Sequence, residues 1–239
     1  MRIVLVVAVL CALALWRPAE VTAAATVPRV CIGCNLAQAQ LAGSDFSGVV
    51  YVGANFSEAD LRNASFRGAK IIAANFENAK LQGAAFDAAD CTACNFDGSK
   101  LDGATFAGVR MTAANFAGFA SAVDNGQLRE LLARCVACNF RSGQLGGRDF
   151  SNLSLISVDF SKADLQGTKF DGAVLCWNNT EGTQREVKCD KMADARVTGA
   201  SFLNVRLCDD PIGQRECVPV DAAALRRYAG SPLTGAILQ

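Results

Sequence analysis

The apolar residues of this sequence recur at every fifth position, a period that neither an α-helix nor an ordinary β-strand has. The rhythm runs without a slip from Leu36 to Phe116, as in the stretch CNFDGSKLDGATFAGVRMTAANF at 94–116. A small residue, most often alanine, stands two positions before most of the apolar centres. Self-similarity at a short fixed period indicates a solenoid, in which each unit buries its apolar side only against its neighbours.

A longer period of twenty residues lies on top of the first. Every fourth centre repeats in kind, and in one column each centre follows an asparagine: Leu36, Phe56, Phe76, Phe96 and Phe116. Four unequal fives predict a four-sided coil with one five per wall. The large centre and the small residue before it both point inward, because a narrow tube has room for one large side chain per wall only beside a small one. Glycine, asparagine and aspartate suit the corners, and the asparagine column is expected to stack its side-chain amides.

Two phrases carry a family resemblance. The segments Ala59-Asp60-Leu61-Arg62-Asn63 and Ala163-Asp164-Leu165-Gln166-Gly167 resemble the A(D/N)LXX units of pentapeptide repeat proteins. The resemblance covers roughly residues 31–116 and 135–207, and it implies an all-β solenoid, a right-handed quadrilateral β-helix. It implies no single function, because one fold hosts several roles.

The rhythm stops after Phe116 and resumes at Phe140. Between them Leu128, Leu131, Leu132 and Val136 recur at helical spacing, after Asp124 and Asn125 as possible caps. We therefore expect a short helical insert at 121–134 that replaces two walls of one turn. Residues 24–120 and 135–239 then form the first and second blocks of one continuous solenoid, and the alternative is that the helix begins a second domain.

Two loops interrupt the second block, and each begins and ends with a cysteine. We predict that Cys176 is joined to Cys189 and Cys208 to Cys217, because a polar loop with little core gains most from a cross-link that restricts the unfolded chain. The repeat should keep its register across the first loop, and a helix is possible at 220–228.

The first residues have the pattern of an export signal. Met1 and Arg2 precede an apolar run and then small residues at 21–25, which predicts a signal peptide at 1–23 cleaved near Ala23. An uncleaved membrane anchor would need about 20 apolar residues, and the run at 3–16 is shorter than that. We therefore expect a secreted or periplasmic protein without stable membrane insertion. Cleavage would leave a formal charge of −1, which does not favour binding to nucleic acid.

Ten cysteines would remain after cleavage, an even number that favours disulfides over metal sites in an exported chain. Six of them form three CxxC pairs at one corner of the tube: Cys31 with Cys34, Cys91 with Cys94, and Cys135 with Cys138. Three turns at the strand spacing separate the first pair from the second by roughly 14 Å, which excludes one shared zinc site. We expect corner disulfides, and the alternatives are reduced core cysteines or a redox-active dithiol, which needs an accessible thiolate.

The expected function is that of a non-enzymatic, rigid protein-binding or structural module, with a protein partner and without a cofactor or metal. Contact residues are expected where the repeat is interrupted: Leu128, Arg129, Arg134, Trp177, Arg185, Asp209, Asp210 and Arg215. One alternative is a periplasmic thiol-disulfide protein that uses its CxxC pairs, although the chain has no histidine to assist it. The other, implied by the resemblance, is a DNA-mimic that binds gyrase, which the export signal and the small net charge disfavour.

Overall fold

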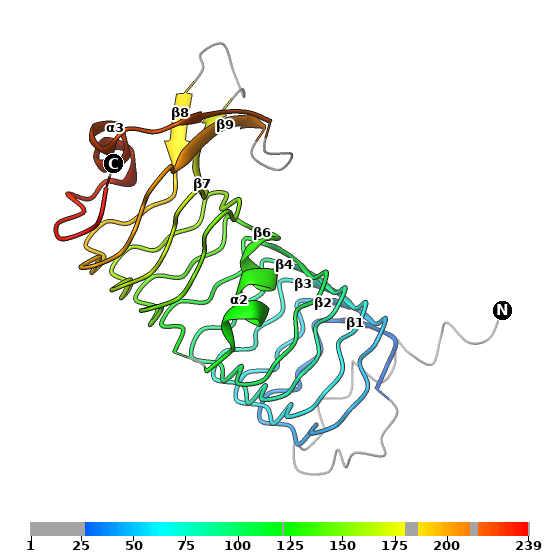
Figure 1. Cartoon of the computed structure of the whole chain (residues 1–239). Coiled ribbons are helices and arrows are strands. Elements are labelled where there is room, and N and C mark those ends of the chain that lie inside the picture. The colour runs from blue at the N-terminus through cyan, green and yellow to red at the C-terminus, as the bar shows by residue number, and fades with distance from the viewer. Residues whose placement is uncertain (1–26, 121, 180–185, 211–214, 239) are drawn as a thin grey trace.

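The computed structural model describes residues 27–120, 122–179, 186–210 and 215–238. The chain winds into a tube of coils stacked along one axis (Figure 1). One wall, here called the sheet wall, holds six parallel strands in chain order: β1 (Val30–Ile32), β2 (Val50–Val52), β3 (Lys70–Ile72), β4 (Asp90–Thr92), β5 (Arg110–Thr112) and β6 (Cys135–Val136). The other walls are joined by single bridges between residues twenty apart, such as Asn55 with Asn75. The predicted solenoid with one five per wall is confirmed.

The large apolar centres fill the inside of the tube. Phe56, Phe76 and Phe96 are fully or almost fully buried, and the ring centroids of successive members lie 5.0 and 4.9 Å apart with nearly parallel planes. The small partner Ala74, two residues before Phe76, is also buried. Burial of each phenylalanine contributes about 1.5–3 kcal/mol, so the stacked rings are a main source of stability.

The corners use left-handed backbone two residues after each centre. Gly83 has a φ of +70°, and a Cβ there would collide with the side chain of Asn63 in the preceding coil. Asn63 itself has a φ of 58° at the equivalent corner. Glycine and asparagine suit these corners, as the sequence predicts, but alanine also occupies several of them, with a φ of 53° at Ala73 and 57° at Ala88.

The asparagine column forms a hydrogen-bonded ladder on its wall. Asn95 Nδ2 donates to Asn75 Oδ1 at 3.0 Å, and Asn115 Nδ2 donates to Asn95 Oδ1 at 2.8 Å. The Asn95 Oδ1 also accepts the backbone N–H of Asp97 at 3.2 Å. The ladder thus stabilises the coils that carry it.

The insert contains helix α2 (Asn125–Leu132), whose first turn is capped by the Asp124 side chain. Leu128, Leu131 and Leu132 are buried, which confirms an amphipathic helix. Val136 belongs to β6 instead, because it pairs with neighbours on the sheet wall.

The tube continues across the insert. The rings of Phe116 and Phe140 are stacked with centroids 5.0 Å apart, and Asn115 bridges Asn139. Helix α2 lies on one side of the tube (Figure 1), and among the described residues the bridge columns through Lys100 and Thr105 stop at this level.

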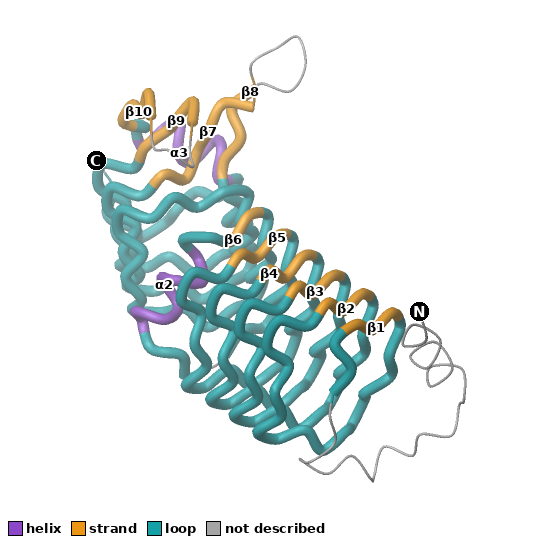
Figure 2. The backbone as a smooth tube through the Cα atoms, turned by 90° about the vertical axis from the view of Figure 1, so that its right-hand side faces the viewer, coloured by secondary structure: helices purple, strands orange, loops and turns teal. Residues whose placement is uncertain are grey.

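The end of the tube farthest from β1 carries two hairpins (Figure 2). Strands β7 (Val174–Asn179), β8 (Glu186–Cys189), β9 (Arg206–Asp210) and β10 (Arg215–Pro219) form a sheet in the order β10-β9-β7-β8. Cys176 pairs with Cys189 and Cys208 with Cys217 across the antiparallel strands, and both predicted disulfides are present, with Cα–Cα distances of 4.0 and 4.1 Å.

The repeat keeps its register beyond the first hairpin. The ring of Phe202 stacks on that of Phe170, with centroids 4.9 Å apart. Helix α3 (Ala222–Ala229) then packs against the last coils, and Met192 N–H donates to the Ala229 carbonyl oxygen at 3.0 Å. Asp221 caps α3 through the Ala224 N–H, so the helix starts at residue 222 and not at 220.

Candidate functional site

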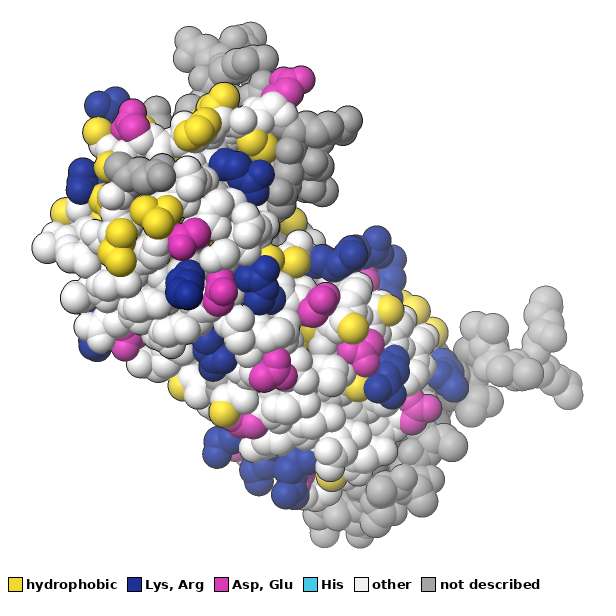
Figure 3. All heavy atoms as spheres, viewed as in Figure 1, with side chains coloured by type: hydrophobic (Ala, Val, Ile, Leu, Met, Phe, Trp, Pro, Cys, Tyr) yellow, Lys and Arg dark blue, Asp and Glu magenta, His cyan; other side chains and the backbone are white. Residues whose placement is uncertain are grey.

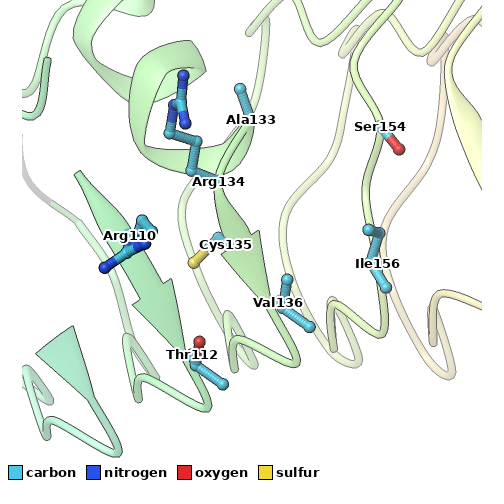
Figure 4. Close-up of a pocket in the computed structure, with 8 residues that line it drawn as sticks. All are labelled: Arg110, Thr112, Ala133, Arg134, Cys135, Val136, Ser154 and Ile156. Carbon is cyan, nitrogen blue, oxygen red and sulfur yellow. The ribbon is translucent and has the colours of Figure 1, made fainter. Parts of the chain in front are cut away.

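A hollow of about 480 Å³ opens on the outside of the sheet wall, where the chain returns from α2 into β6 (Figure 4). We call it the Arg134 hollow, and its lining residues are Arg110, Thr112, Ala133, Arg134, Cys135, Val136, Ser154 and Ile156. The hollow lies at the point where the insert departs from the regular coil. Its position makes it the first candidate for a binding site on the tube.

Two arginines line this hollow. Met111 of β5 pairs with Cys135 of β6, so Arg110 in β5 and Arg134, the residue just before β6, are neighbours along the strand ladder. Arg110 Nη2 contacts Asp90 Oδ2 at 2.8 Å, whereas Arg134 is exposed and has no ion pair with any residue that the structure describes. Like charges opposite each other in a sheet are destabilising. The hollow therefore carries one uncompensated positive charge.

The floor of the hollow is apolar. Val136 and Ile156 bridge each other on the outside of the sheet wall, and both are half-buried. They end a column of β-branched side chains that repeats once per coil: Ile32, Val52, Ile72, Thr92, Thr112, Val136 and Ile156. Figure 3 shows hydrophobic side chains along the edge of the tube over β1 to β3, next to Lys and Arg side chains.

The structure corrects the expectation for Leu128 and redefines Arg129. Leu128 is fully buried in the core beneath α2, so it cannot touch a partner. Arg129 donates to the carbonyl oxygens of Asp149 and Ser151 in the next coil, at 2.9 and 3.0 Å. Of the insert residues expected to make contacts, Arg134 is the exposed one.

The other expected contact residues lie on the hairpins. Trp177 is in β7 and pairs with Cys208 of β9, and Asp210 pairs with Arg215 across β9 and β10, so these strands are adjacent. The side chains of Trp177, Asp209, Asp210 and Arg215, and all of Arg185, lie outside the described part of the structure. Their role stays a prediction.

The three CxxC pairs are disulfides in the structure, with Cα–Cα distances of 5.9, 5.9 and 5.8 Å. Five of these six cysteines are buried, and Cys34 in the first coil is half-buried. All three pairs occupy the corner that follows the sheet wall, as expected. Within the described residues, no three His, Cys, Asp or Glu side chains are placed to hold a metal ion.

Asp190 is a feature that the sequence analysis missed. Its Oδ1 accepts the backbone N–H of Val158 at 2.8 Å, and its Oδ2 is buried with no hydrogen-bond partner among the described residues. Burial raises the pKa of the Asp190 carboxyl well above its ordinary value, and the hydrogen bond from Val158 opposes that effect. Asp190 stands two residues before the centre Met192, where the other coils have a small or apolar residue, and that exception was the available signal.

The Arg134 hollow was also only half visible in the sequence. Arg134 stands out in the sequence because it belongs to the insert, and Val136 fits the helical spacing there, whereas Arg110, Ser154 and Ile156 lie in regular repeats that do not mark them. Alignment of Asn139-Phe140 with Asn115-Phe116, a shift of 24 residues across the insert, places Arg110 beside Arg134. Of the helices that the structure describes, none is long and apolar enough to cross a membrane.

Comparison with known proteins identifies the repeat. Residues 39–116 match the family model described as a pentapeptide repeat region, and residues 133–175 match the model described as pentapeptide repeats in eight copies. No curated protein sequence matches this chain.

Similar solved structures include QnrB1, a plasmid-mediated fluoroquinolone resistance protein (14% identity, TM-score 0.44, 70% of this chain and 89% of that chain). HetL from Nostoc sp. strain PCC 7120, involved in heterocyst differentiation regulation, is 20% identical (TM-score 0.29, 88% and 83%). A pentapeptide repeat protein of the Arabidopsis thaliana thylakoid lumen is 26% identical (TM-score 0.29, 46% and 78%). With its five-residue centres, four-walled coils and matches to both repeat models, this chain belongs to the pentapeptide repeat family.

Proposed function

We propose that this protein is an exported, non-enzymatic solenoid that acts as a rigid protein-binding module. One observation carries the proposal: the segments that depart from the repeat lie on the outside of one continuous tube. These segments are α2, with the Arg134 hollow beside it, and the two hairpins. The inward side chains are buried in the core, and the asparagine side chains hydrogen-bond to one another, so neither set is available to a partner. A rigid scaffold that presents irregular segments is a common arrangement for recognition.

The state of the cysteines supports both the export and the non-enzymatic parts of the proposal. Disulfides persist in oxidising compartments and are rare in the cytosol, and the structure pairs ten cysteines in five disulfides. A dithiol catalyst needs an accessible thiolate with a lowered pKa, and this chain has no histidine to supply a neighbouring positive charge.

A capture experiment tests the binding role. Tagged full-length protein, expressed with its first 23 residues in a bacterium that has a periplasm, is compared with a variant whose residues 177–188 are replaced by a short Gly-Ser linker. Cys176 and Cys189 are kept, so the cross-link at the base of the hairpin is preserved. The control carries Glu77→Gln and Lys80→Gln, two exposed changes on regular walls that leave the net charge unchanged.

We expect the intact protein and the control to retain the same periplasmic proteins, and the hairpin variant to retain fewer of them. Recovery of the tagged protein in the cytosolic fraction with its first 23 residues uncleaved would contradict export. If the intact protein specifically retains nothing, the binding proposal is wrong.

A thiol-disulfide role is the second candidate, and the half-buried Cys34 in the first coil is the observation that favours it. Titration of free thiols in the native protein separates the two functions. We expect the ten cysteines after residue 23 to give no free thiol. A reduced, accessible CxxC pair with a thiolate pKa near neutrality would favour the redox role instead.

A further inference from the structure

We infer that the Arg134 hollow binds a carboxylate-bearing aliphatic segment of a protein partner. This inference rests on the protein-binding role proposed above and adds the chemistry of the partner. It is carried by the charge pattern of the arginines, by the apolar floor and by the shape of the hollow.

The charge pattern is the first step. Among the residues that the structure describes, arginines contact aspartates within 4 Å in six pairs: Arg62–Asp60, Arg67–Asp87, Arg110–Asp90, Arg129–Asp149, Arg141–Asp159 and Arg196–Asp164. Arg134 lies outside this pattern, because no acidic residue of the described chain pairs with it and its neighbour in β5 is Arg110. Arg29 and Arg148 also have no ion pair among the described residues, but their guanidinium groups donate to the carbonyl oxygens of Ser47 and Val123. A carboxylate supplied from outside would pair with the Arg134 guanidinium through charge-assisted hydrogen bonds.

The apolar floor is the second step. Val136 follows Arg134 by two residues, so its side chain and that of its bridge partner Ile156 face the same outer side of the wall. Figure 4 shows the Val136 and Ile156 side chains on one side of the hollow and the Arg134 side chain on the other side, where it points toward α2. The hollow therefore has a cationic group at one end and aliphatic surface at the other, which fits a carboxylate that is followed by an aliphatic side chain.

The shape is the third step. A volume of about 480 Å³ lies within the range of ligand pockets, but the hollow is open to solvent and continues into the β-branched column at Thr112 and Thr92. An extended peptide can leave its carboxylate at Arg134 and run along this column. A small molecule would need an enclosed cavity to bury most of its surface, and the sheet wall does not provide one at this hollow.

Titrations of methyl-labelled full-length protein with three short peptides, followed by NMR, test the inference. The peptides are acetyl-Val-Val-Ile with a free carboxylate, the same peptide as its amide, and acetyl-Val-Glu-Val-Ile amide, which carries its carboxylate on a side chain. We expect saturable shifts of the Val136 and Ile156 methyl signals with at least one of the two carboxylate peptides and not with the neutral amide. The peptide that shifts them tells whether a chain terminus or an acidic side chain is recognised.

Arg134→Gln should weaken this binding at least about tenfold. Arg67→Gln, which removes the same charge from another wall, should leave it unchanged. Both residues are exposed, so both variants should keep the methyl spectrum of the folded protein. The inference is wrong if the neutral amide shifts these signals as strongly as the acids do, or if Arg134→Gln binds as the parent protein does. It is also wrong if no peptide shifts them at about 10 mM, a concentration that detects a millimolar Kd.

Failure of these titrations is distinguishable from failure of the proposed function. If the intact protein still captures partners that depend on the hairpin at 177–188, the binding role stands and only the carboxylate site is lost. If capture fails as well, the binding role itself is wrong.

Discussion

Arg129 Nη2 donates a hydrogen bond to the carbonyl oxygen of Ser151, 3.0 Å away in the coil that follows α2. In a regular coil that carbonyl accepts a backbone N–H from the coil before it, as the Arg67 oxygen does from Gly48. At this level α2 takes the place of a regular coil. Its side chains therefore donate to the carbonyl oxygens that backbone N–H groups of a regular coil would otherwise reach. Arg129 Nη1 also reaches the Asp149 oxygen at 2.9 Å, and the Asn125 side chain accepts the Asp149 N–H at 3.0 Å.

Replacement of Arg129 should therefore destabilise the protein more than replacement of an ordinary surface arginine. Arg129→Ala leaves two backbone carbonyls without these partners and should lower the free energy of unfolding by about 1–3 kcal/mol, measured by urea denaturation. Arg67→Ala, which breaks an exposed ion pair, is the control and should cost less than about 1 kcal/mol. Equal losses in the two variants would contradict the bridging role.

The stacked phenylalanines predict a large cost for truncation in the middle of the tube. Phe76 is fully buried between the rings of Phe56 and Phe96, so Phe76→Ala should lower the free energy of unfolding by about 3–5 kcal/mol. Ile32→Ala is the matched control, because Ile32 is 75% exposed on the outside of the sheet wall, and its effect should stay within about 0.5 kcal/mol. A Phe76→Ala loss as small as that of the control would show that the rings do not carry the core.

The disulfide at the base of the first hairpin should stabilise the fold through the unfolded chain. Cys176 and Cys189 are 13 residues apart, and the chain-entropy model gives about 3 kcal/mol for a loop of this size. The double variant Cys176→Ser, Cys189→Ser should lose about this amount in urea denaturation followed by circular dichroism. A loss below about 1 kcal/mol would mean that the strand pairing of β7 with β8 holds the hairpin without the cross-link.

Asp190 predicts an unusual dependence of stability on pH. Its pKa in the folded protein is raised by burial, so the folded state holds a proton that the unfolded state has released. The stabilisation is present below the ordinary carboxyl pKa of about 3.9 and is lost as the pH rises through the folded value. Asp190→Asn keeps a neutral side chain at all pH values, so its stability relative to the parent protein should increase as the pH is raised from about 4.

Asp45→Asn is the control of opposite sign. Hydrogen bonds from the Ser47 side chain and backbone lower the pKa of the Asp45 carboxyl, so the stabilisation from this group is lost as the pH falls. Urea titrations of Asp190→Asn between about pH 4 and 8, and of Asp45→Asn between about pH 5 and 2, measure the two slopes. Parallel pH profiles for Asp190→Asn and the parent protein would refute the buried, protonated state.

The sequence alone determined the architecture, because a five-residue rhythm is a local pattern that specifies which side chains point inward. The column of Phe56, Phe76 and Phe96 predicted both the twenty-residue coil and the stacking. The cysteine at each end of each loop predicted both hairpin disulfides, and Leu131 and Leu132 at helical spacing predicted α2. These features depend on residues close in sequence or on exact repetition, and both can be read without coordinates.

Only the tertiary structure decided what the exceptions do. Arg129 and Arg134 look alike in the sequence, five residues apart at the insert, yet the first is bonded to the next coil and the second is exposed beside Arg110. Leu128 was expected on a contact surface and is buried, and the buried Asp190 carboxyl with its raised pKa was not expected at all. The physical reason is distance along the chain, because the partner of each exceptional side chain lies some twenty or more residues away. The insert and the hairpins also change the number of residues per coil, so the twenty-residue period no longer locates that partner.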